Sequence, residues 1–440
     1  MIMQNELAAI IGKEWVREGE ASAEYAVDGV LPKVVVWPGT VEEVAAILRQ
    51  AYKAGWSVVP AGYGMGLSLG NVPESIDLVL STTRLSKILD YEPADLTASV
   101  QAGCSLDRFN RTVGEHGQWL PLDPLRPDRA TLGAVAAVND FGPLRLGFGL
   151  PRDYVIGLEV VQADGRRIKT GGRVVKNVAG YDLNKLFVGS HGTLGIMTQL
   201  NLKVRPRPET EATCLIASGH TPVLDDFVKT LAVSELSPAA VESLWNKTAH
   251  RLSVPCPPVC SVMLVRFMDA EPAVRYQVRR LREIAQLHEL ESEELPDTLA
   301  EPLWRSIRDL STGADANLVV RINTLPVDTE FWLLHLLWAL TDQTQVLDLL
   351  THHRSGVVRG LAWCDVTEAR CKELAARLGQ LRNYCRENGG SLVIQRAPVE
   401  LKKYIDVWGE VGPTAEIMRA LKQQFDPRRI LNPGRFVAGI

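Results

Sequence analysis

A strand–helix–strand unit that runs directly into a glycine-rich loop limits the possible folds of this chain more than any other part of it. Residues 33–37, KVVVW, form a short β-rich run, and Thr40 with Glu43 predicts a capping box at the start of a helix. Apolar residues then recur at helical spacing until a glycine ends the helix, and residues 57–60, SVVP, predict a buried strand. The loop that follows, PAGYGMGLSLGN at 60–71, therefore starts at the end of a strand.

This loop has two interpretations. Glycine adopts positive φ at little cost, so the loop is either a set of tight turns or a nest of backbone N–H groups that holds an anion such as phosphate. The dinucleotide fingerprint G-x-G-x-x-G fails, because the sixth position counted from Gly62 or Gly64 is Leu67 or Leu69. A phosphate here would have to be held by backbone amides alone.

Two further segments are rich in small residues. Residues 131–149 read TLGAVAAVNDFGPLRLGFG, and residues 176–200 place Gly189, Gly192 and Gly195 just before a predicted strand. A turn or a close packing contact explains each segment taken alone. A single extended ligand that touches all three glycine-rich segments explains them together.

Composition narrows the function classes. The chain has 440 residues and is 46% hydrophobic, which favours more than one domain. Its net charge of −4 gives no reason to expect a nucleic acid partner. It contains no run of 18 apolar residues, and its N-terminus lacks the pattern of a signal peptide. The seven scattered cysteines indicate reduced thiols in the cytoplasm, and Cys256 and Cys260 form a lone close pair, so we predict no metal site.

The pattern of the chain changes after RPRPE at 205–209. Residues 210–400 alternate β runs such as NLVVRIN and GVVRGLAW with long helical patterns, which predicts an antiparallel sheet with helices on one face. No internal repeat is visible in the sequence. We predict three parts, at 1–206, 207–400 and 401–440.

The order of these motifs resembles the flavin-binding domain of the vanillyl-alcohol oxidase and p-cresol methylhydroxylase superfamily. The resemblance is carried by GPLRLGFGLPRDYVIGLEVV, by GGRVVKNVAGYDLNKLFVGSHGTLGIMT and by the terminal FDPRRILNPGRF. Within the superfamily the chain is similar to the FAD-binding subunit of bacterial glycolate oxidase that accompanies a catalytic flavoprotein. The resemblance implies an α+β protein: a PCMH-type FAD-binding domain of two subdomains, an α+β cap domain with an antiparallel sheet, and a C-terminal segment that returns to the FAD domain.

The resemblance also implies which residues bind FAD. The loop would hold the pyrophosphate through Gly62, Tyr63, Gly64, Met65, Gly66, Leu67 and Ser68. The ribityl chain and flavin would lie along Thr131, Gly133, Ala134 and Ala137. The other side of the cofactor would be framed by Gly142, Arg145, Leu146 and Gly147, and the adenine half would be closed off by Gly195 and Ile196.

Several positions have no role assigned by the resemblance. Lys176, Tyr181 and Asp182 match a KNxxGYD element near the flavin pocket and are equally explained as structural residues, as is His191. No histidine occurs in the loop, so we predict that FAD is bound non-covalently there.

The catalytic residues are not identified from the sequence. Catalytic 2-hydroxy-acid dehydrogenases of the superfamily carry a metal-binding H-x-G-D-G-N-x-H segment, and this chain has GGSLVIQRAP at 389–398 in the comparable place. The resemblance therefore implies a cytoplasmic FAD-dependent oxidoreductase that is a subunit of a glycolate oxidase-like complex. Its partners would be a catalytic FAD subunit and an iron–sulfur subunit, and any contact with the inner membrane would run through them. We expect little or no glycolate or D-lactate oxidation by the chain alone.

Two alternatives stay open at this point. One is a self-sufficient FAD-dependent alcohol or hydroxy-acid dehydrogenase with a non-metal base, for which Tyr181 and His353 are the candidates. The other is a non-redox assembly scaffold whose flavin site has decayed.

Overall fold

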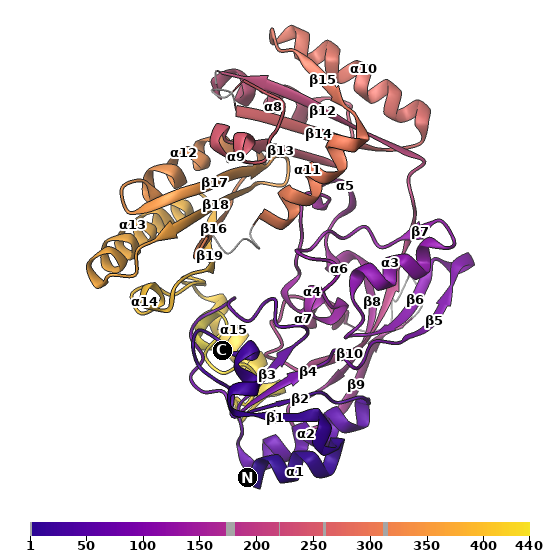
Figure 1. Cartoon of the computed structure of the whole chain (residues 1–440), viewed down its shortest axis with the longest axis vertical. Helices are drawn as coiled ribbons and strands as arrows, with labels where there is room; N and C mark the ends of the chain where they lie inside the picture. Colours follow the sequence, from indigo (N-terminus) through magenta and orange to yellow (C-terminus); the bar gives the residue numbers. More distant parts are fainter. Residues whose placement is uncertain (1, 173–180, 220, 258–260, 311–315) are drawn as a thin grey trace. The chain divides into compact units, whose positions relative to one another are not determined.

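The computed structural model of the chain describes residues 2–172, 181–219, 221–257, 261–310 and 316–440. The chain forms two compact units. Unit 1 consists of Met1–Phe141, Leu150–Arg207 and Glu410–Ile440, and unit 2 consists of Gly142–Gly149 and Pro208–Gly409. Their elements are labelled in Figure 1.

The first part of unit 1 is a small sheet whose inner strands are parallel. Across the sheet the strands are β1 (Val16–Glu18), β2 (Val34–Val36), β4 (Leu78–Ser81) and β3 (Val58–Ala61). Parallel pairing of β2 and β3 with β4 needs a crossover, and helix α2 (Val41–Ala54) provides it. Buried residues of α2 and of α1 (Ile2–Ile11) pack with these strands in one apolar cluster.

The start of α2 follows the sequence prediction with one difference. The Thr40 hydroxyl accepts a hydrogen bond from the Glu43 amide at 3.1 Å, as an N-cap residue does. The Glu43 carboxylate, however, accepts from the Gly39 amide at 2.6 Å, one residue before the cap. The helix ends at Gly55, whose φ of +75° is the left-handed conformation that glycine adopts readily.

The second part of unit 1 is an antiparallel five-stranded sheet. Its strands in order are β5 (Ile88–Glu92), β6 (Thr97–Gln101), β10 (Ile196–Lys203), β8 (Val155–Val161) and β9 (Arg167–Gly171). Its core includes residues of α3 (Leu106–Gly114) and α4 (Leu132–Val138). The Asp-Gly turn after VIGLEVV joins β8 and β9 into an antiparallel hairpin.

Unit 2 contains an eight-stranded antiparallel sheet built from two halves of the same topology. Each half reads strand, helix, two strands, helix, strand. The first half is β12 (Thr210–Ser218), α8 (Thr221–Val233), β13 (Ala240–Leu244), β14 (Ser261–Asp269), α10 (Glu271–Leu287) and β15 (Ser292–Leu295). The second half is β16 (Leu318–Asn323), α12 (Thr329–Leu340), β17 (Thr344–His352), β18 (Val357–Cys364), α13 (Glu368–Glu387) and β19 (Ser391–Arg396).

The two halves join edge to edge. The strand order is β15-β12-β14-β13-β17-β18-β16-β19, so the second strands of the two halves, β13 and β17, pair at the centre. The order within the second half is the mirror image of the first. A repeat that the sequence does not reveal is therefore present in the topology.

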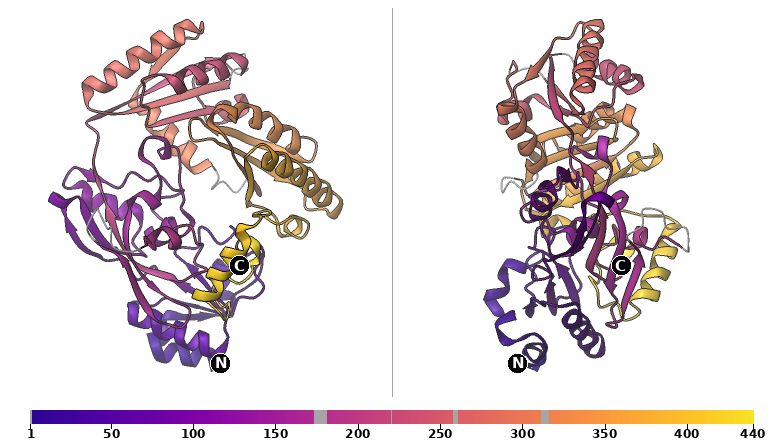
Figure 2. Two further views of the ribbon diagram at one scale, coloured as in Figure 1. Left: turned by 180° about the vertical axis from the view of Figure 1, so that it is seen from behind. Right: turned by 90° about the vertical axis from the view of Figure 1, so that its right-hand side faces the viewer.

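Helices cover the two faces of this sheet unequally. The four repeat helices α8, α10, α12 and α13 lie on one face, as the view from behind shows (Figure 2). The inserted helices α9 (Asn246–Arg251) and α11 (Asp297–Asp309) pack on the other face through a separate apolar cluster.

Apart from α15, which has 12 residues, the remaining elements are short. They are β7 (Gln118–Trp119), β11 (Arg205–Pro206), α5 (Arg145–Phe148), α6 (Pro151–Tyr154), α7 (Asn184–Phe187), α14 (Val399–Lys402), α15 (Thr414–Phe425), and the 3-10 helices at Lys13–Trp15, Gly19–Tyr25, Pro93–Asp95, Pro326–Asp328 and Val437–Gly439. Among the described residues, no helix has the length and apolar character needed to cross a membrane. The α+β class with antiparallel sheets is confirmed.

Candidate functional site

The glycine loop after β3 consists of tight turns. The Leu67 amide donates to the Gly64 carbonyl at 3.2 Å and the Leu69 amide donates to the Gly66 carbonyl at 3.1 Å. Gly64 has a φ of +81° and Gly70 a φ of +103°. The backbone path therefore requires glycine at these two positions, because other residues rarely adopt such φ values.

The loop also offers backbone donors to an anion. Within the residues that the structure describes, the amides of Gly64, Met65 and Gly66 donate to no protein acceptor. A side chain at Gly66 would meet no atom within 4 Å, and Met65 is exposed. A run of open amides in a glycine-rich turn suits an oxyanion, so the turn geometry is compatible with the pyrophosphate of FAD, and the contact itself stays a prediction.

The second glycine-rich segment packs directly against the first. Thr131 caps α4, with its hydroxyl accepting from the Ala134 amide at 3.4 Å. A Cβ atom on Gly62 would lie 2.4 Å from the Thr131 hydroxyl oxygen, so the two segments approach closely only because Gly62 has no side chain. Gly133 allows a similar close approach, because a Cβ atom added to it would lie only 2.7 Å from the Cβ of Ala102.

The third segment pairs with the second. The amides of Gly189 and His191 donate to the carbonyls of Ala136 and Ala137 at 3.0 and 2.8 Å. Gly195 leads into Ile196 at the start of β10, and a Cβ on Gly195 would lie 2.5 Å from a methyl group of Val160. The structure thus brings the three segments together in unit 1, while their contact with FAD stays a prediction.

The C-terminal segment binds two of these loops from within the same unit. The Arg435 guanidinium donates to the carbonyls of Leu67 and Leu69 at 2.6 and 2.7 Å. The side chains of Asn432 and Lys422 donate to the carbonyls of His191 and Thr193 at 2.6 and 2.9 Å. No motif singles out these residues in the sequence, although each is a polar residue beside the apolar positions of FDPRRILNPGRF or its preceding helix.

Arg435 is a buried cation at the edge of the glycine loop. Burial lowers the pKa of its guanidinium to about 10, against a partial rise from Asp28, so it remains charged at neutral pH. Its carbonyl partners fix the loop, and its charge favours an anion nearby. It supplies a cation to a glycine loop, Gly62–Gly70, that contains no basic residue of its own.

Four predicted FAD residues lie in unit 2. Gly142, Arg145, Leu146 and Gly147 belong to the segment that packs with β13, where the Gly147 amide donates to the Ala239 carbonyl at 3.0 Å. Leu146 packs against the apolar cluster of the first half of the sheet. This explains why a segment that the sequence analysis assigned to the first domain is found with the second; its contact with FAD stays a prediction.

Unit 2 holds a polar cluster that the sequence analysis did not find. Glu242 and His352 are register partners on β13 and β17, and Arg321 and Arg359 are register partners on β16 and β18. Register partners share a face of the sheet, and so do residues two apart on one strand. Leu350 is the partner of Arg359 and lies two residues before His352 on β17, so His352 and Arg359 share a face. All four side chains therefore lie on one face of the sheet. The signal in the sequence is an arginine in the middle of two otherwise apolar strands.

The geometry of this cluster defines a histidine–carboxylate pair among arginines. His352 Nδ1 lies 2.7 Å from the Glu242 carboxylate, and both side chains are buried. Burial, followed by the charges of Arg359 and Arg145, lowers the pKa of His352 well below its usual value. Arg145 belongs to α5, which packs with β13, and burial followed by repulsion from Arg359 lowers its pKa.

The other candidate residues do not join either site. Lys176 lies outside the described residues, Tyr181 is 96% exposed, and Asp182 accepts from the Asn184 amide. The His191 ring stacks on Phe436 with 4.6 Å between centroids. His353 is buried against Thr329, Thr351 and Ser243, away from the arginine cluster. In the described ranges no group of three or more metal-ligating side chains is assembled, and Cys260 lies outside them.

Comparison with known sequences identifies the ligand of unit 1. Residues 32–171 match the family described as "FAD binding domain", and residues 407–436 match "FAD linked oxidases, C-terminal domain". The two matches contain the glycine loop and the segment of Arg435, which contact each other. The protein is an FAD-dependent oxidoreductase.

Two similar proteins align with nearly the whole length of the flavoprotein. The chain is 29% identical over 425 residues to the glycolate oxidase subunit GlcD of Bacillus subtilis, which covers 93% of this chain and 89% of that protein. It is 28% identical to D-2-hydroxyglutarate dehydrogenase of Xanthomonas citri pv. viticola, covering 96% and 91% of the two chains. The resemblance to glycolate oxidase subunits is confirmed. The subunit matched here is GlcD, whereas the sequence motifs indicated the FAD-binding subunit that accompanies a catalytic flavoprotein.

The fold of the flavoprotein is shared with solved structures. It matches p-cresol methylhydroxylase with substrate bound at a TM-score of 0.78 and 14% identity, over 99% of this chain and 96% of that one. At this identity the likeness concerns the fold. The expected PCMH-type fold is thereby confirmed.

Proposed function

We propose that the flavoprotein is a subunit of a 2-hydroxy-acid dehydrogenase complex and that the polar cluster of unit 2 binds the substrate. The observation that carries the proposal is the arrangement of Glu242, His352, Arg321 and Arg359 on four adjacent strands, with Arg145 beside them. Oxidation of a hydroxy acid needs a group that binds the carboxylate and a base that takes the hydroxyl proton. The cluster contains both kinds of group.

The arginines are suited to the substrate carboxylate. A guanidinium presents paired N–H donors that match a carboxylate, and it keeps its charge when buried. Burial, and after it repulsion from Arg359, lowers the pKa of Arg145, and a bound anion would offset that repulsion. Substrate binding at this point is therefore favoured by charge as well as by hydrogen-bond geometry.

His352 is suited to take the proton of the substrate hydroxyl. Its lowered pKa keeps the ring neutral near pH 7, and Nδ1 then donates to the Glu242 carboxylate, which leaves Nε2 as the basic atom. A substrate carboxylate would offset the arginine charges, so the basicity of Nε2 rises when the substrate is bound. FAD supplies the hydride acceptor, and the chain supplies orientation and proton transfer.

The assignment to a complex rests on the relatives. The relative from Bacillus subtilis is named as a subunit of glycolate oxidase, which supports a partner-dependent enzyme for this chain as well. A catalytic FAD subunit and an iron–sulfur subunit are the partners that the sequence resemblance implies, with any membrane contact running through them. The polar cluster favours a substrate site in this chain, in contrast to the weak activity expected from the sequence.

The test is anaerobic bleaching of the bound flavin by glycolate, D-lactate and D-2-hydroxyglutarate. We expect bleaching by at least one acid, and a loss on the order of 10²-fold or more in its rate in His352→Gln, as for a general base. Arg359→Met should raise the substrate concentration needed for half-maximal bleaching by at least about tenfold, since charge-assisted hydrogen bonds are lost.

Matched controls separate this role from general damage. His353→Gln removes the neighbouring imidazole, and Arg279→Met removes an exposed guanidinium of α10; both should bleach like the wild type. Flavin that no 2-hydroxy acid bleaches, with or without an iron–sulfur partner, would overturn the proposal. Bleaching that survives unchanged in both His352→Gln and Arg359→Met would remove the cluster from the substrate site.

A further inference from the structure

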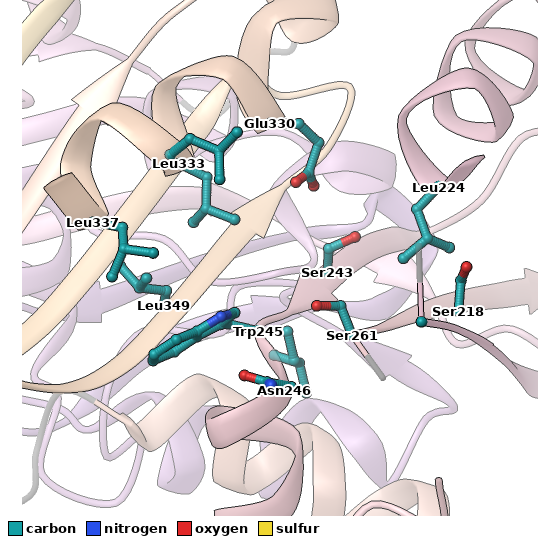
Figure 3. A pocket seen from close by; sticks show the side chains of 13 residues that line it. Ser218, Leu224, Ser243, Trp245, Asn246, Ser261, Glu330, Leu333, Leu337 and Leu349 are labelled. Atoms are coloured by element: carbon teal, nitrogen blue, oxygen red, sulfur yellow. The ribbon is translucent and has the colours of Figure 1, made fainter. Parts of the chain in front are cut away.

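A cavity of about 140 Å³ lies in unit 2 at the centre of the duplicated sheet (Figure 3). It is bounded by the first helices of the two halves, α8 and α12, and by the adjoining strands β13 and β17. Its apolar walls are contributed by Leu224, Leu244, Trp245, Leu333, Leu334, Leu337 and Leu349. Polar groups line the rest of it, from Ser218, Ser243, Asn246, Ser261 and Glu330. A cavity of this size accommodates a molecule about as large as benzene, with its apolar part among the leucines and a polar group at the polar wall.

The cavity is separate from the arginine cluster. Ser243 follows Glu242 on β13 and Thr351 precedes His352 on β17, and successive residues of a strand point to opposite faces. Ser243 and Thr351 are register partners, so they lie together on the helix-covered face, while Glu242 and His352 lie on the other. The cavity thus belongs to a part of unit 2 that the proposed substrate chemistry does not use.

One end of the cavity carries a buried carboxylate. Glu330 lines the cavity, and its side chain is 9% exposed. One of its oxygens lies 3.3 Å from His353 Nε2, but that nitrogen lies closer to the hydroxyls of Ser243 and Thr351, at 2.7 and 2.8 Å. His353 Nδ1 lies 2.8 Å from the Thr329 hydroxyl.

Glu330 therefore has only a long contact with the imidazole. Both ring nitrogens of His353 already have hydroxyl neighbours at hydrogen-bond distance, so the imidazole is a poor partner for the carboxylate. In the part of the chain that the structure describes, no other cation is within ion-pair distance of Glu330. A carboxylate this deeply buried is stabilised by a charged donor, and a ligand can bring one.

The opposite end of the cavity is less suited to a cation. The Trp245 ring lies away from the Glu330 carboxylate (Figure 3), and Lys247 Nζ lies 5.0 Å from the centroid of that ring. A second positive charge near Lys247 would be repelled. The cationic end of a ligand is therefore expected at Glu330 and its apolar end among the leucines.

We propose that this cavity is a binding site for a small organic ammonium ion, a protonated primary amine attached to an apolar group of about six carbon atoms. The ammonium donates to the Glu330 carboxylate and to the hydroxyls beside it, and the apolar group packs against α8 and α12. Because α8 and α12 belong to different halves of the sheet, the ligand bridges the seam of the duplication.

The test uses benzylamine and benzyl alcohol as probes on the FAD-loaded full-length chain, in ligand-detected NMR titrations at pH 7.5. The two probes share an apolar ring and differ in charge at the head group. Benzylamine is expected to bind saturably and at least about tenfold more tightly than benzyl alcohol, since the difference is one charge-assisted hydrogen bond. Glu330→Gln should bring the affinity for benzylamine down to that for benzyl alcohol.

Two further variants keep the test decisive. Leu337→Trp fills the cavity while leaving the carboxylate in place, and it should abolish saturable binding of both probes; it decides the matter if Glu330→Gln does not fold. Glu115→Gln, at an exposed carboxylate of unit 1, should leave both affinities unchanged. Absence of saturable benzylamine binding, equal affinity for the two probes, or unchanged binding in folded Leu337→Trp would each overturn the proposal.

Discussion

At the level of single residues, the structure separates glycines needed for space from glycines needed for backbone conformation. Gly62, Gly133 and Gly195 lie where a Cβ would meet another segment at 2.4–2.7 Å, so their role is close packing between segments. Gly64 differs, because its φ is +81° and there is more space around it. The atom nearest to an added Cβ would be a methyl carbon of Leu67, at 3.3 Å. Its conformation exposes the amides that the pyrophosphate is predicted to use.

Gly64→Val is expected to abolish most FAD binding. A β-branched residue at positive φ is strained by roughly 1–2 kcal/mol, and the side chain would occupy the space beside the open amides. The dissociation constant for FAD should rise at least about tenfold, which about 1.4 kcal/mol of lost binding free energy produces, and FAD content after gel filtration should fall.

The matched control is Gly117→Val. Gly117 also has a positive φ, +66°, and no atom lies within 4 Å of its Cβ position, yet it is outside the glycine-rich segments. It should carry the same backbone strain and retain FAD. Equal flavin loss in the two variants would show that strain alone, and not the loop, governs cofactor content.

At the level of elements, the C-terminal segment organises the glycine-rich loops of unit 1. Helix α15 positions Lys422, which donates to the carbonyls of Thr193 and Leu431 and to the Asp426 carboxylate at 2.7–2.9 Å. Asp426 is fully buried and also accepts from the amides of Ile430 and Leu431. One buried ion pair thus fixes the end of the helix, the turn after it and the loop that precedes β10.

Lys422→Met should destabilise unit 1 by about 3–5 kcal/mol, because it leaves the Asp426 charge buried without its partner. Lys422→Met/Asp426→Asn should be less destabilised than the single variant. The free energies of unfolding are measured by urea titration of the FAD-loaded chain.

An exposed pair of the same spacing is the control. Lys372 and Glu368 are also four residues apart on a helix but lie at the surface, so Lys372→Met should change the unfolding midpoint very little. A small effect of Lys422→Met, comparable to that of Lys372→Met, would contradict the assignment of Lys422 as an organising residue.

At the level of the whole molecule, the cores contain thiols that are kept protonated. Burial raises the pKa of Cys214 and Cys385 to about 12 and that of Cys364 to about 11, from an ordinary value of 9.0. Unfolding exposes these thiols, so the unfolded chain releases their protons near pH 9 while the folded chain retains them. The folded state therefore binds more protons in this range, and its stability falls as pH rises from about 9 toward 11.

The urea midpoint is expected to be lower at pH 10.5 than at pH 8.5. Each pH unit in this window changes the contribution of Cys214 by on the order of 1 kcal/mol. In Cys214→Ala the decrease between the two pH values should be smaller than in the wild type, whatever the variant does to absolute stability. An unchanged decrease would show that other groups dominate the alkaline loss of stability.

The local elements and the identity of the cofactor domain can be predicted from the order of amino acids alone. The cap at Thr40, the stop at Gly55 and the alternation around the hairpin at 155–171 act between neighbours in the chain, so pattern and propensity predict them. The glycine-rich segments were also visible, because a missing side chain is a property of the sequence. That they meet in space was inferred from a single ligand touching all three, and the resemblance then named that ligand.

Which residues far apart in the chain contact each other, in contrast, is decided only by the tertiary structure. Arg435 reaches loop carbonyls 366 and 368 residues away, and His352 meets Glu242 across 110 residues. Such contacts depend on strand order and register, and a shift of one residue would turn His352 to the helix-covered face and His353 to the other. The duplicated topology of unit 2 was hidden for the same reason: packing constrains volume and polarity at each position, and two halves satisfy those constraints with unrelated residues.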